Sequence, residues 1–283
     1  MRTRVLIAPL LALLGACSRE SRSPTDPTVT PPATVTVFPG FDTSLYPGDA
    51  AMSAWVYPSS PYYWSGYYLP APCHRDVTWT NKYTTLHAMG WGLAAIYVGQ
   101  QDWTQIPQSI VVRGASEAAR ASQSIVSEQA VCSASLLSAE QGTLEAADAV
   151  ARLKSDGFPD LSIVFLDVEF VTSVTPMLLD YYRAWIAGVI RDGHYRPGIY
   201  AAKSNATTLY IAAVDAAHAA GSSEQPAFWI AASSGFSIGQ VPTAVGLDFA
   251  KLWQGMFDVT QTWNGKTLLI DVDVASRRSP SAP

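Results

Sequence analysis

The sequence predicts an α/β fold, a single-domain (β/α) barrel of the TIM type whose closing part is irregular. Three observations support this prediction. Short apolar runs alternate with segments of helix length. About eight of these runs have strand character. The part of the chain that holds them, residues 35–283, has the length of one such barrel, roughly 250 residues. Parallel strands need crossovers of about a dozen residues or more, and the segments between the runs provide them.

The expected strands are short, rich in β-branched, aromatic or other apolar residues, and bounded by Gly, Pro or Asp. In chain order they are residues 33–42, 62–69, 93–98, 162–169, 197–202, 226–233, 249–256 and 266–274. The last two are joined by a short loop that contains Trp263-Asn264-Gly265. This loop leaves no room for a helix, so the alternation is imperfect at the end of the chain.

The expected helices lie between the strands, at residues 114–131, 144–157, 175–193 and 207–220. Thr143 is predicted to cap the second helix, and Gly157 to end it. Thr175 and Pro176 open the third helix with a proline in its first turn, and Gly193 closes it. These local signals set the ends of the helices independently of the fold.

The first 34 residues are predicted to target and tether the protein. Residues 1–16 combine a short basic head with an apolar run that is too short for a membrane span of about 20 residues, which indicates a secretory signal. The LGAC stretch that ends at Cys17 resembles a bacterial lipobox, and the resemblance implies that Cys17 is acylated. The alternative is an ordinary signal peptide with an incidental cysteine. Residues 17–34, rich in Ser, Thr and Pro, are expected to form an extended tether.

These features predict a location in the cell envelope, on the periplasmic face of the outer membrane or at the cell surface. The membrane would be a partner through the lipid anchor. Loss of residues 1–16, which hold two arginines and no acids, lowers the net charge from −5 to −7. An acidic chain without a basic cluster argues against a nucleic acid partner. Few charges and many aromatic residues favour an uncharged ligand.

The chain has 3 cysteines. If Cys17 carries the lipid, Cys73 and Cys132 remain in an oxidising compartment, and a disulfide between them is predicted. The alternative is a metal site made of Cys73, His74 and Cys132, but these residues lack a recognisable ligand spacing. No histidine pattern or glycine-rich phosphate loop is present in the sequence, so no metal or organic cofactor is expected.

Two acids stand in the apolar stretch IVFLDVEF. Asp167 and Glu169 are two residues apart on a strand, so both project to the same face, with Cα atoms roughly 6.5–7 Å apart. In a parallel barrel the C-terminal ends of the strands form the active-site face. Two close carboxylates repel, and burial raises the pKa further. One of the two acids is therefore a candidate proton donor at neutral pH.

Acids recur at two other strand ends. Asp42 ends the first strand, and Asp271 and Asp273 share a face near the end of the last. The first and last strands of a closed barrel are neighbours, so Asp42 and Asp271 are expected to converge. Such an acid can instead cap the next helix, and Asp273 can be exposed on the closing segment. Three acidic strand ends together favour a functional site.

Aromatic and amide side chains in the strands complete the predicted site. Sugars present apolar faces to aromatic rings and hydroxyls to amides. The candidate ligand-binding residues are Tyr97, Tyr200, Trp229, Trp253 and Gln254. Each aromatic side chain can alternatively belong to the hydrophobic core.

Several motifs occur in the order seen in a known family. They are GFDTSLYP at 40–47, IVFLDVE at 163–169, RPGIYAA at 196–202, FWIA at 228–231, LWQG at 252–255 and LLIDVDVA at 268–275. This set resembles the muramidase-type lysozymes of glycoside hydrolase family 25. With GFDT, YWSGYYL, GLAAIYVG and DVE, the chain is more similar still to the glycoside-hydrolase-like proteins called domain of unknown function family 1906.

The resemblance extends from about residue 38 to residue 275 and implies a modified barrel with a glycan-facing cleft. Matched by position, Glu169 is implied to be the general acid, and Asp167, Asp42 and Asp271 the acids that stabilise positive charge or orient a water or the substrate. The predicted function is acid-assisted hydrolysis of peptidoglycan or a related polysaccharide. The alternative is a catalytically inactive lipoprotein that uses the same barrel to bind glycan or to act as a scaffold.

Overall fold

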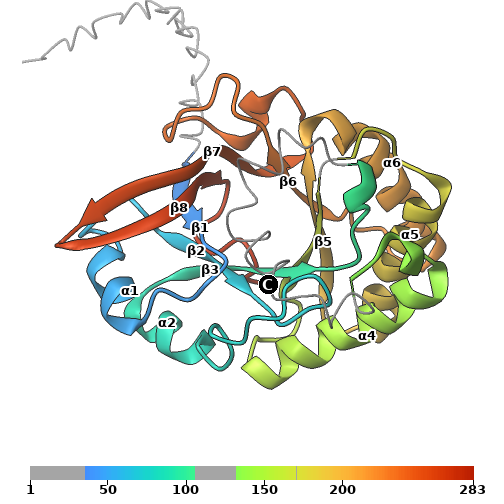
Figure 1. The fold of residues 1–283 in the computed structure, drawn as a ribbon, viewed down its shortest axis with the longest axis horizontal. Helices are drawn as coiled ribbons and strands as arrows, with labels where there is room; N and C mark the ends of the chain where they lie inside the picture. Colours follow the sequence, from blue (N-terminus) through green and yellow to red (C-terminus); the bar gives the residue numbers. More distant parts are fainter. Residues whose placement is uncertain (1–35, 106–131, 170) are drawn as a thin grey trace, which may run out of the picture. The chain divides into compact units, whose positions relative to one another are not determined.

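The computed structural model describes residues 36–105, 132–169 and 171–283. Over these ranges eight strands close into a barrel in which each strand pairs with its neighbours in sequence order (Figure 1). The prediction of a single-domain α/β barrel is confirmed. The expected signal, tether and helix 114–131 lie outside the described residues.

All eight expected strands are present. They are β1 (Phe38–Asp42), β2 (Trp64–Tyr68), β3 (Gly92–Val98), β4 (Ile163–Val168), β5 (Arg196–Ala202), β6 (Ala227–Ala231), β7 (Ala250–Trp263) and β8 (Lys266–Ala275). Most of their ends differ from the expected ones by a few residues. The exception is β7, which continues to Trp263 because beyond the barrel it still pairs with β8.

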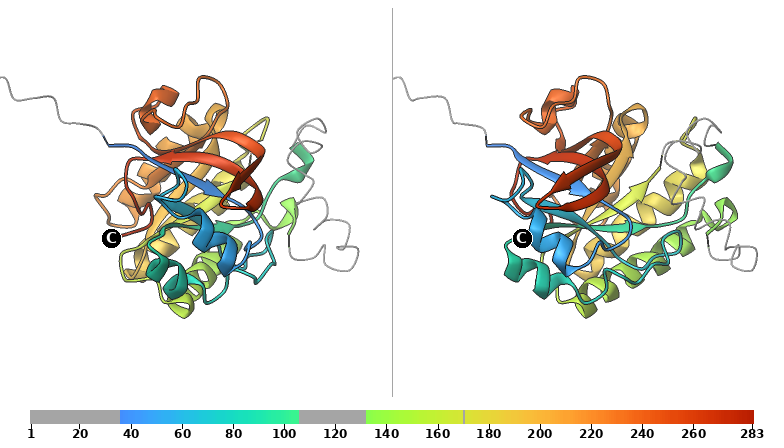
Figure 2. Two further views of the ribbon diagram at one scale, coloured as in Figure 1. Left: turned by 90° about the vertical axis from the view of Figure 1, so that its left-hand side faces the viewer. Right: turned by 60° about the vertical axis from the view of Figure 1, so that its left-hand side comes forward.

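Strand β8 runs antiparallel to both of its neighbours, whereas β1 to β7 are parallel. The turn between β7 and β8 has only two residues, Asn264 and Gly265, with φ angles of 46° and 73°. Two successive positive φ angles are typical of the tight turn of a β-hairpin. The resulting hairpin reaches beyond the barrel wall (Figures 1 and 2). The short loop noticed in the sequence therefore reverses the chain.

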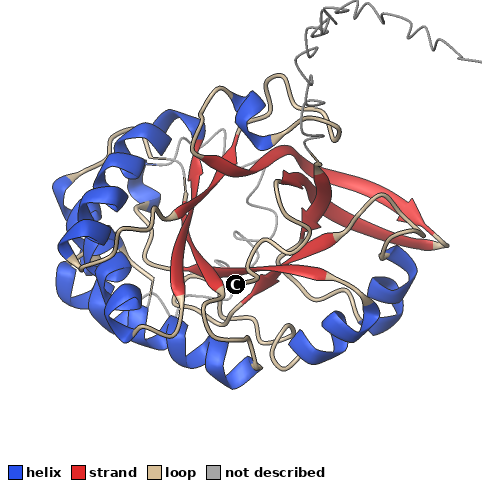
Figure 3. Ribbon diagram, turned by 180° about the vertical axis from the view of Figure 1, so that it is seen from behind, coloured by secondary structure: helices blue, strands red, loops and turns tan. Residues whose placement is uncertain are grey.

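The helices lie outside the ring of strands (Figure 3). They are α1 (Asp49–Trp55), α2 (Tyr83–Met89), α4 (Ala139–Asp156), α5 (Pro176–Asp192) and α6 (Lys203–Ala219), with 3₁₀ helices at Trp103–Gln105, Ala134–Leu136 and Pro242–Val245. Helix α5 has the predicted cap: the Thr175 side chain accepts a hydrogen bond from the Leu178 N–H. Helix α4 corrects a prediction, because Ser138 caps it and Thr143 lies within the helix.

Two hydrophobic cores follow from the alternation of side chains along the strands. One fills the space between the barrel and the helices. The other lies inside the barrel, where Trp64 and Trp229 meet edge to face with their ring centroids 5.4 Å apart. Because these two rings fill the interior, polar side chains farther along the strands are left at the rim formed by the C-terminal strand ends.

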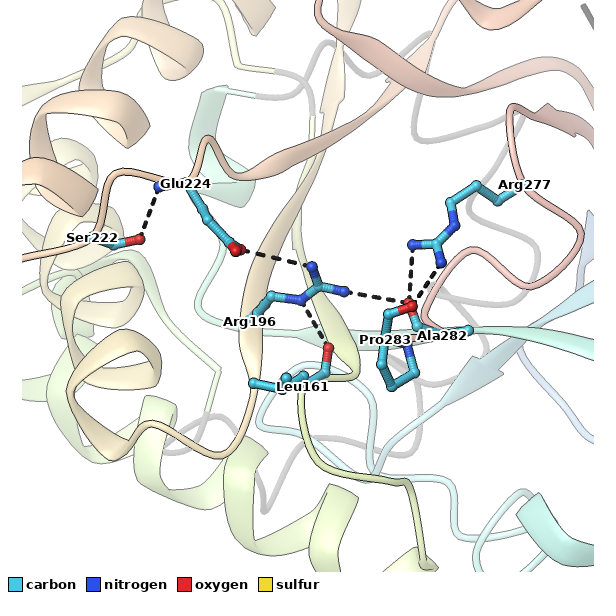
Figure 4. A network of polar contacts seen from close by, with 7 residues as sticks. All are labelled: Leu161, Arg196, Ser222, Glu224, Arg277, Ala282 and Pro283. Atoms are coloured by element: carbon cyan, nitrogen blue, oxygen red, sulfur yellow. Dashed lines mark hydrogen bonds and ion pairs between the residues drawn. The ribbon is translucent and has the colours of Figure 1, made fainter.

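The opposite end of the barrel is closed by the segment that follows β8. Ser281 is 2% exposed. Its N–H donates to the Leu93 carbonyl at 2.9 Å, and its Oγ accepts from the Ala95 N–H at 2.8 Å. The guanidinium groups of Arg196 and Arg277 both donate to the Ala282 carbonyl, at 3.3 and 3.1 Å (Figure 4).

The predicted disulfide between Cys73 and Cys132 is confirmed, with Cα atoms 5.1 Å apart. It links the loop after β2 to the segment that leads into α4. The alternative metal site at these cysteines is therefore excluded, since both sulfur atoms are used in the bond.

Candidate active site

The C-terminal strand ends enclose a small polar depression inside the barrel. It is lined by Asp42, Tyr68, Ile96, Asp167, Tyr200, Trp229 and Gln254. The depression has an empty volume of about 200 Å³ when the open solvent at its mouth is included. Only about 10 Å³ of this volume can hold the centre of a water molecule. That is about the room one water needs. The bottom of the depression therefore admits a single small group.

Gln254 joins two of the acids. Its Nε2 donates to Asp42 Oδ2 at 2.7 Å and to Asp271 Oδ2 at 3.1 Å, and its Oε1 accepts from the Tyr200 hydroxyl at 2.6 Å. The Tyr68 hydroxyl donates to Asp42 Oδ1 at 2.7 Å. Hydrogen bonds from neutral donors favour the charged form of a carboxyl. Asp42 is thus surrounded by donors suited to an ionised carboxylate.

Asp271 reaches the site by a route that the sequence did not predict. It lies in the middle of an antiparallel strand and not at the end of a parallel one, and the hairpin carries the rest of the strand past the rim. The β1–β8 register places Asp271 directly opposite Asp42, so the expected convergence of these acids is confirmed. The Asp258 N–H also donates to Asp271 Oδ1, at 2.7 Å.

Asp167 and Glu169 stand at the end of β4, where a buried glutamine holds the backbone. Gln101, 2% exposed, donates from Nε2 to the Asp167 carbonyl at 2.8 Å and accepts from the Glu169 N–H at 3.1 Å. Asp167 is 8% exposed, and its Oδ1 meets no donor among the described residues. Glu169 is partly exposed. The deeper acid is therefore Asp167, and the more accessible one is Glu169.

Asp273, considered above as an acid that could be exposed, is 0% exposed. Its side chain points into the barrel, and its Oδ1 accepts from the Trp229 indole N–H at 2.9 Å. The reason is the alternation along β8, which puts Asp273 on the same face as Asp271 and one level deeper.

Burial and mutual repulsion raise the pKa values of several acids. Burial raises the pKa of Asp167 well above its usual range, and the charges of Glu169 and Asp42 raise it further. Burial and the charge of Asp42 raise the pKa of Asp271 from 3.8 to about 8. Burial, followed by the charges of Asp42 and Asp271, raises the pKa of Asp273. The site therefore holds protons on carboxyl groups at neutral pH.

The Tyr200 hydroxyl shows that the acids form one cluster. Burial raises its pKa, and the further causes are the negative charges of Glu169, Asp167, Asp42 and Asp271. All four predicted catalytic acids thus act on one hydroxyl group. Clusters of acids with raised pKa values at a strand-end depression are typical of active sites.

Residues 53–275 match the model of the Rv2525c-like, glycoside hydrolase-like domain. The chain belongs to this family. No curated protein matches the sequence.

Solved structures resemble this Rv2525c-like domain along most of its length. An uncharacterized protein from B. stearothermophilus has a TM-score of 0.53 at 17% identity, over 85% of this chain and 97% of that one. The spore cortex lytic enzyme SleM of Clostridium perfringens has a TM-score of 0.50 at 11% identity, over 86% and 68% of the chains. The modular autolysin LytC of Streptococcus pneumoniae has a TM-score of 0.53 at 11% identity, over 84% and 46%. At these identities the likeness shows a shared fold.

The depression gathers three of the five predicted ligand-binding residues, Tyr200, Trp229 and Gln254. Trp229 is only 1% exposed, so it forms the floor and offers no open face to a sugar. Tyr97 and Trp253 lie on the outer face of their strands. The Tyr97 hydroxyl donates to Asp148 of α4, and the Trp253 indole donates to the Ala232 carbonyl. The structure does not bring these two side chains to the site.

Two residues of the site were missed in the sequence. Tyr68 shares the inner face of β2 with Trp64, and the period of two along a strand could have placed it at the rim. Gln101 had no such signal, because it lies in a loop whose path depends on the whole fold.

Within residues 36–105, 132–169 and 171–283, no group of three or more His, Cys, Asp or Glu side chains could hold a metal ion. In the same part of the chain, no helix has the length and apolar character needed to cross a membrane.

Proposed function

We propose that this Rv2525c-like domain hydrolyses a glycosidic bond in peptidoglycan or a related cell-envelope polysaccharide. The observation that carries the proposal is the single cluster of Asp42, Asp167, Glu169 and Asp271, in which carboxyl groups keep protons at neutral pH. Glycoside cleavage needs one protonated and one ionised carboxyl on either side of the scissile bond. The neighbours named as an autolysin and a spore cortex lytic enzyme support a cell-wall glycan as substrate.

Asp167 and Glu169 act as a pair that shares a proton. Close carboxyl groups titrate together, and burial favours the neutral form of the deeper one. Glu169 is the more accessible member, so it is the general acid. It gives the shared proton to the leaving oxygen, the proton held on Asp167 passes to Glu169 as it does so, and the pair is left ionised. Asp42, held by Tyr68 and Gln254, keeps its charge and stabilises the positive charge that develops on the sugar.

The test is incubation with purified cell-wall glycan, followed by mass analysis of the released fragments. Glu169→Gln should release none, because an amide cannot donate this proton, and its unfolding midpoint should stay near that of the wild type. Glu224→Gln is the matched control, since that side chain is 70% exposed and pairs with Arg196. Equal product from Glu169→Gln and the wild type would refute the assignment.

Binding of glycan without cleavage is the second candidate. The observation that favours it is the size of the depression, whose bottom has room for about one water and not for a sugar ring. Its signature is saturable binding of cell-wall glycan with no product, unchanged in Glu169→Gln. Trp253→Ala is not an informative variant for this purpose, because the Trp253 side chain faces the helices and not the interior of the barrel.

For the N-terminal segment we propose a lipid anchor on Cys17 after removal of residues 1–16, with residues 17–34 as a tether at the cell envelope. The support is the LGAC sequence. Metabolic labelling with a radioactive fatty acid should label the wild type and not Cys17→Ser. Labelling of both would contradict the proposal, and so would a Cys17→Ser protein that stays in the membrane fraction.

A further inference from the structure

Asp273 is an acid that the proposed reaction does not use, although it lies directly beneath the site. It is 0% exposed, and β8 pairs it with Gly40 of β1 and Gln254 of β7. Since Gly40 has no side chain, the Trp64 indole packs directly against that glycine. The Asp273 carboxyl lies beside this tryptophan floor of the barrel, where it accepts from the Trp229 indole.

The two oxygens of Asp273 have different surroundings. Oδ1 accepts from the Trp229 indole at 2.9 Å. Oδ2 is buried and meets no N–H or O–H donor among the described residues. Burial raises the pKa of the Asp273 carboxyl, and the neighbouring Asp42 carboxyl interacts with it and raises the pKa further. Two carboxyl groups form a hydrogen bond only if one of them carries a proton. A charged, unpaired oxygen at this depth would be strongly unfavourable.

Among the described residues, few titratable groups lie close enough to Asp273 to exchange a proton with it. Those that act on the Asp273 carboxyl are Asp42 from β1 and Asp271 from the same strand. An ionised Asp273 would in turn act on the buried hydroxyl of Tyr62, which precedes β2. The nearby side chains of β6 and β7, Trp229 and Gln254, do not titrate. Asp42 already accepts from Tyr68 and Gln254, so it has the donors of an ionised carboxylate.

We propose that Asp273 stays protonated and donates a hydrogen bond to Asp42, and that it is thereby the positioning residue that keeps Asp42 ionised and correctly oriented. Asp273 touches no substrate in this role. Its protonation does not depend on the proposed function, whereas its benefit to glycan cleavage rests on it.

Infrared difference spectroscopy of wild type minus Asp273→Asn at neutral pH tests the protonation directly. Asparagine keeps the acceptor for Trp229 and offers an N–H to Asp42, so the fold should be retained. The difference spectrum should contain the carbonyl band of a protonated carboxylic acid that shifts in heavy water. A carboxylate band in its place would overturn the proposal, whether or not the protein proves to be a hydrolase.

The positioning role is tested by two variants in the glycan assay. Asp273→Asn should keep kcat within about threefold of the wild type, because the donor to Asp42 is restored, whereas Asp273→Leu should lose about tenfold or more. A loss of about 100-fold in Asp273→Asn would show that Asp273 acts as an ionised base, and this result would overturn the proposal. Equal activity of Asp273→Leu and the wild type would overturn it too.

Discussion

Replacing Asp271 with asparagine should change how the free energy of unfolding depends on pH. In the folded protein, chiefly through burial, the pKa of this carboxyl is about 8 instead of 3.8. Between about pH 4 and pH 8 the folded state keeps a proton that the unfolded state has released. The contribution of this group to stability is therefore highest below about pH 4, falls as the pH rises, and levels off above about pH 8.

The magnitude follows from the difference between the two pKa values. Each pH unit is worth about 1.4 kcal/mol, so the whole range corresponds to about 6 kcal/mol. Part of this free energy comes from repulsion by the charges of Asp42 and Glu169. These two acids will titrate differently once residue 271 is neutral, so the asparagine variant does not recover the whole amount. We take about half, or about 3 kcal/mol, as the stability that Asp271→Asn recovers at high pH.

Urea unfolding at about pH 5, pH 7 and pH 9 measures this effect. Asp271→Asn should gain on the wild type with rising pH, by about 2 kcal/mol between the first and last of these values. Asp160→Asn is the control for the loss of one charge, because its side chain is 74% exposed. If the curves of Asp271→Asn and the wild type are parallel, the carboxyl does not keep its proton in the folded protein and the reasoning is refuted.

Three further predictions concern the supports of the site and barrel. Gln101→Leu should lower kcat about tenfold or more with KM nearly unchanged, because it frees the backbone between the two acids of the pair, and an unchanged kcat in steady-state kinetics would contradict this. Cys132→Ser should lower the free energy of unfolding in urea by about 4 kcal/mol, as expected for a disulfide with a sequence separation of 59. Unfolding of the oxidised and the reduced wild type at the same urea concentration would contradict this. Ser281→Ala should cost about 1–3 kcal/mol, since the buried Ala95 N–H loses its acceptor. A smaller loss than in Ser222→Ala, a variant at a partly exposed surface position, would count against a sealing role for this segment.

The barrel could be predicted because its signals are local. Thr175 and Gly193 bound α5 as expected, since a capping hydroxyl and a left-handed glycine need no tertiary contact. The start of α4 was misplaced because Ser138 and Thr143 have the same capping chemistry, and only the rest of the fold selects between them. The short helices α1 and α2 are too brief for a helical period to be recognised.

The acids of the site could be predicted because a closed barrel brings strand ends together. The candidate ligand-binding residues were harder to predict, because a shift of one residue along a strand decides whether a side chain faces the barrel interior or the helices. Trp253 and Gln254 are adjacent in β7, so alternation alone excludes that both face the site. Gln254 faces inward and Trp253 outward. Tyr97 faces the helices for the same reason, since the preceding residue, Ile96, faces the interior.

The reversal of β8 explains how two similar sequence motifs build a site with two levels. Along β4 the chain runs towards the rim, so the first acid, Asp167, is 8% exposed and the second, Glu169, is accessible. Along β8 the chain runs away from the rim, so the first acid, Asp271, is partly exposed and the second, Asp273, is 0% exposed. Each deep acid has an oxygen without a donor among the described residues. The deep acids are thus suited to hold protons away from a substrate. The upper acids are suited to meet one, although Asp271 also keeps a proton up to about pH 8. A parallel β8 would have exchanged the positions of Asp271 and Asp273.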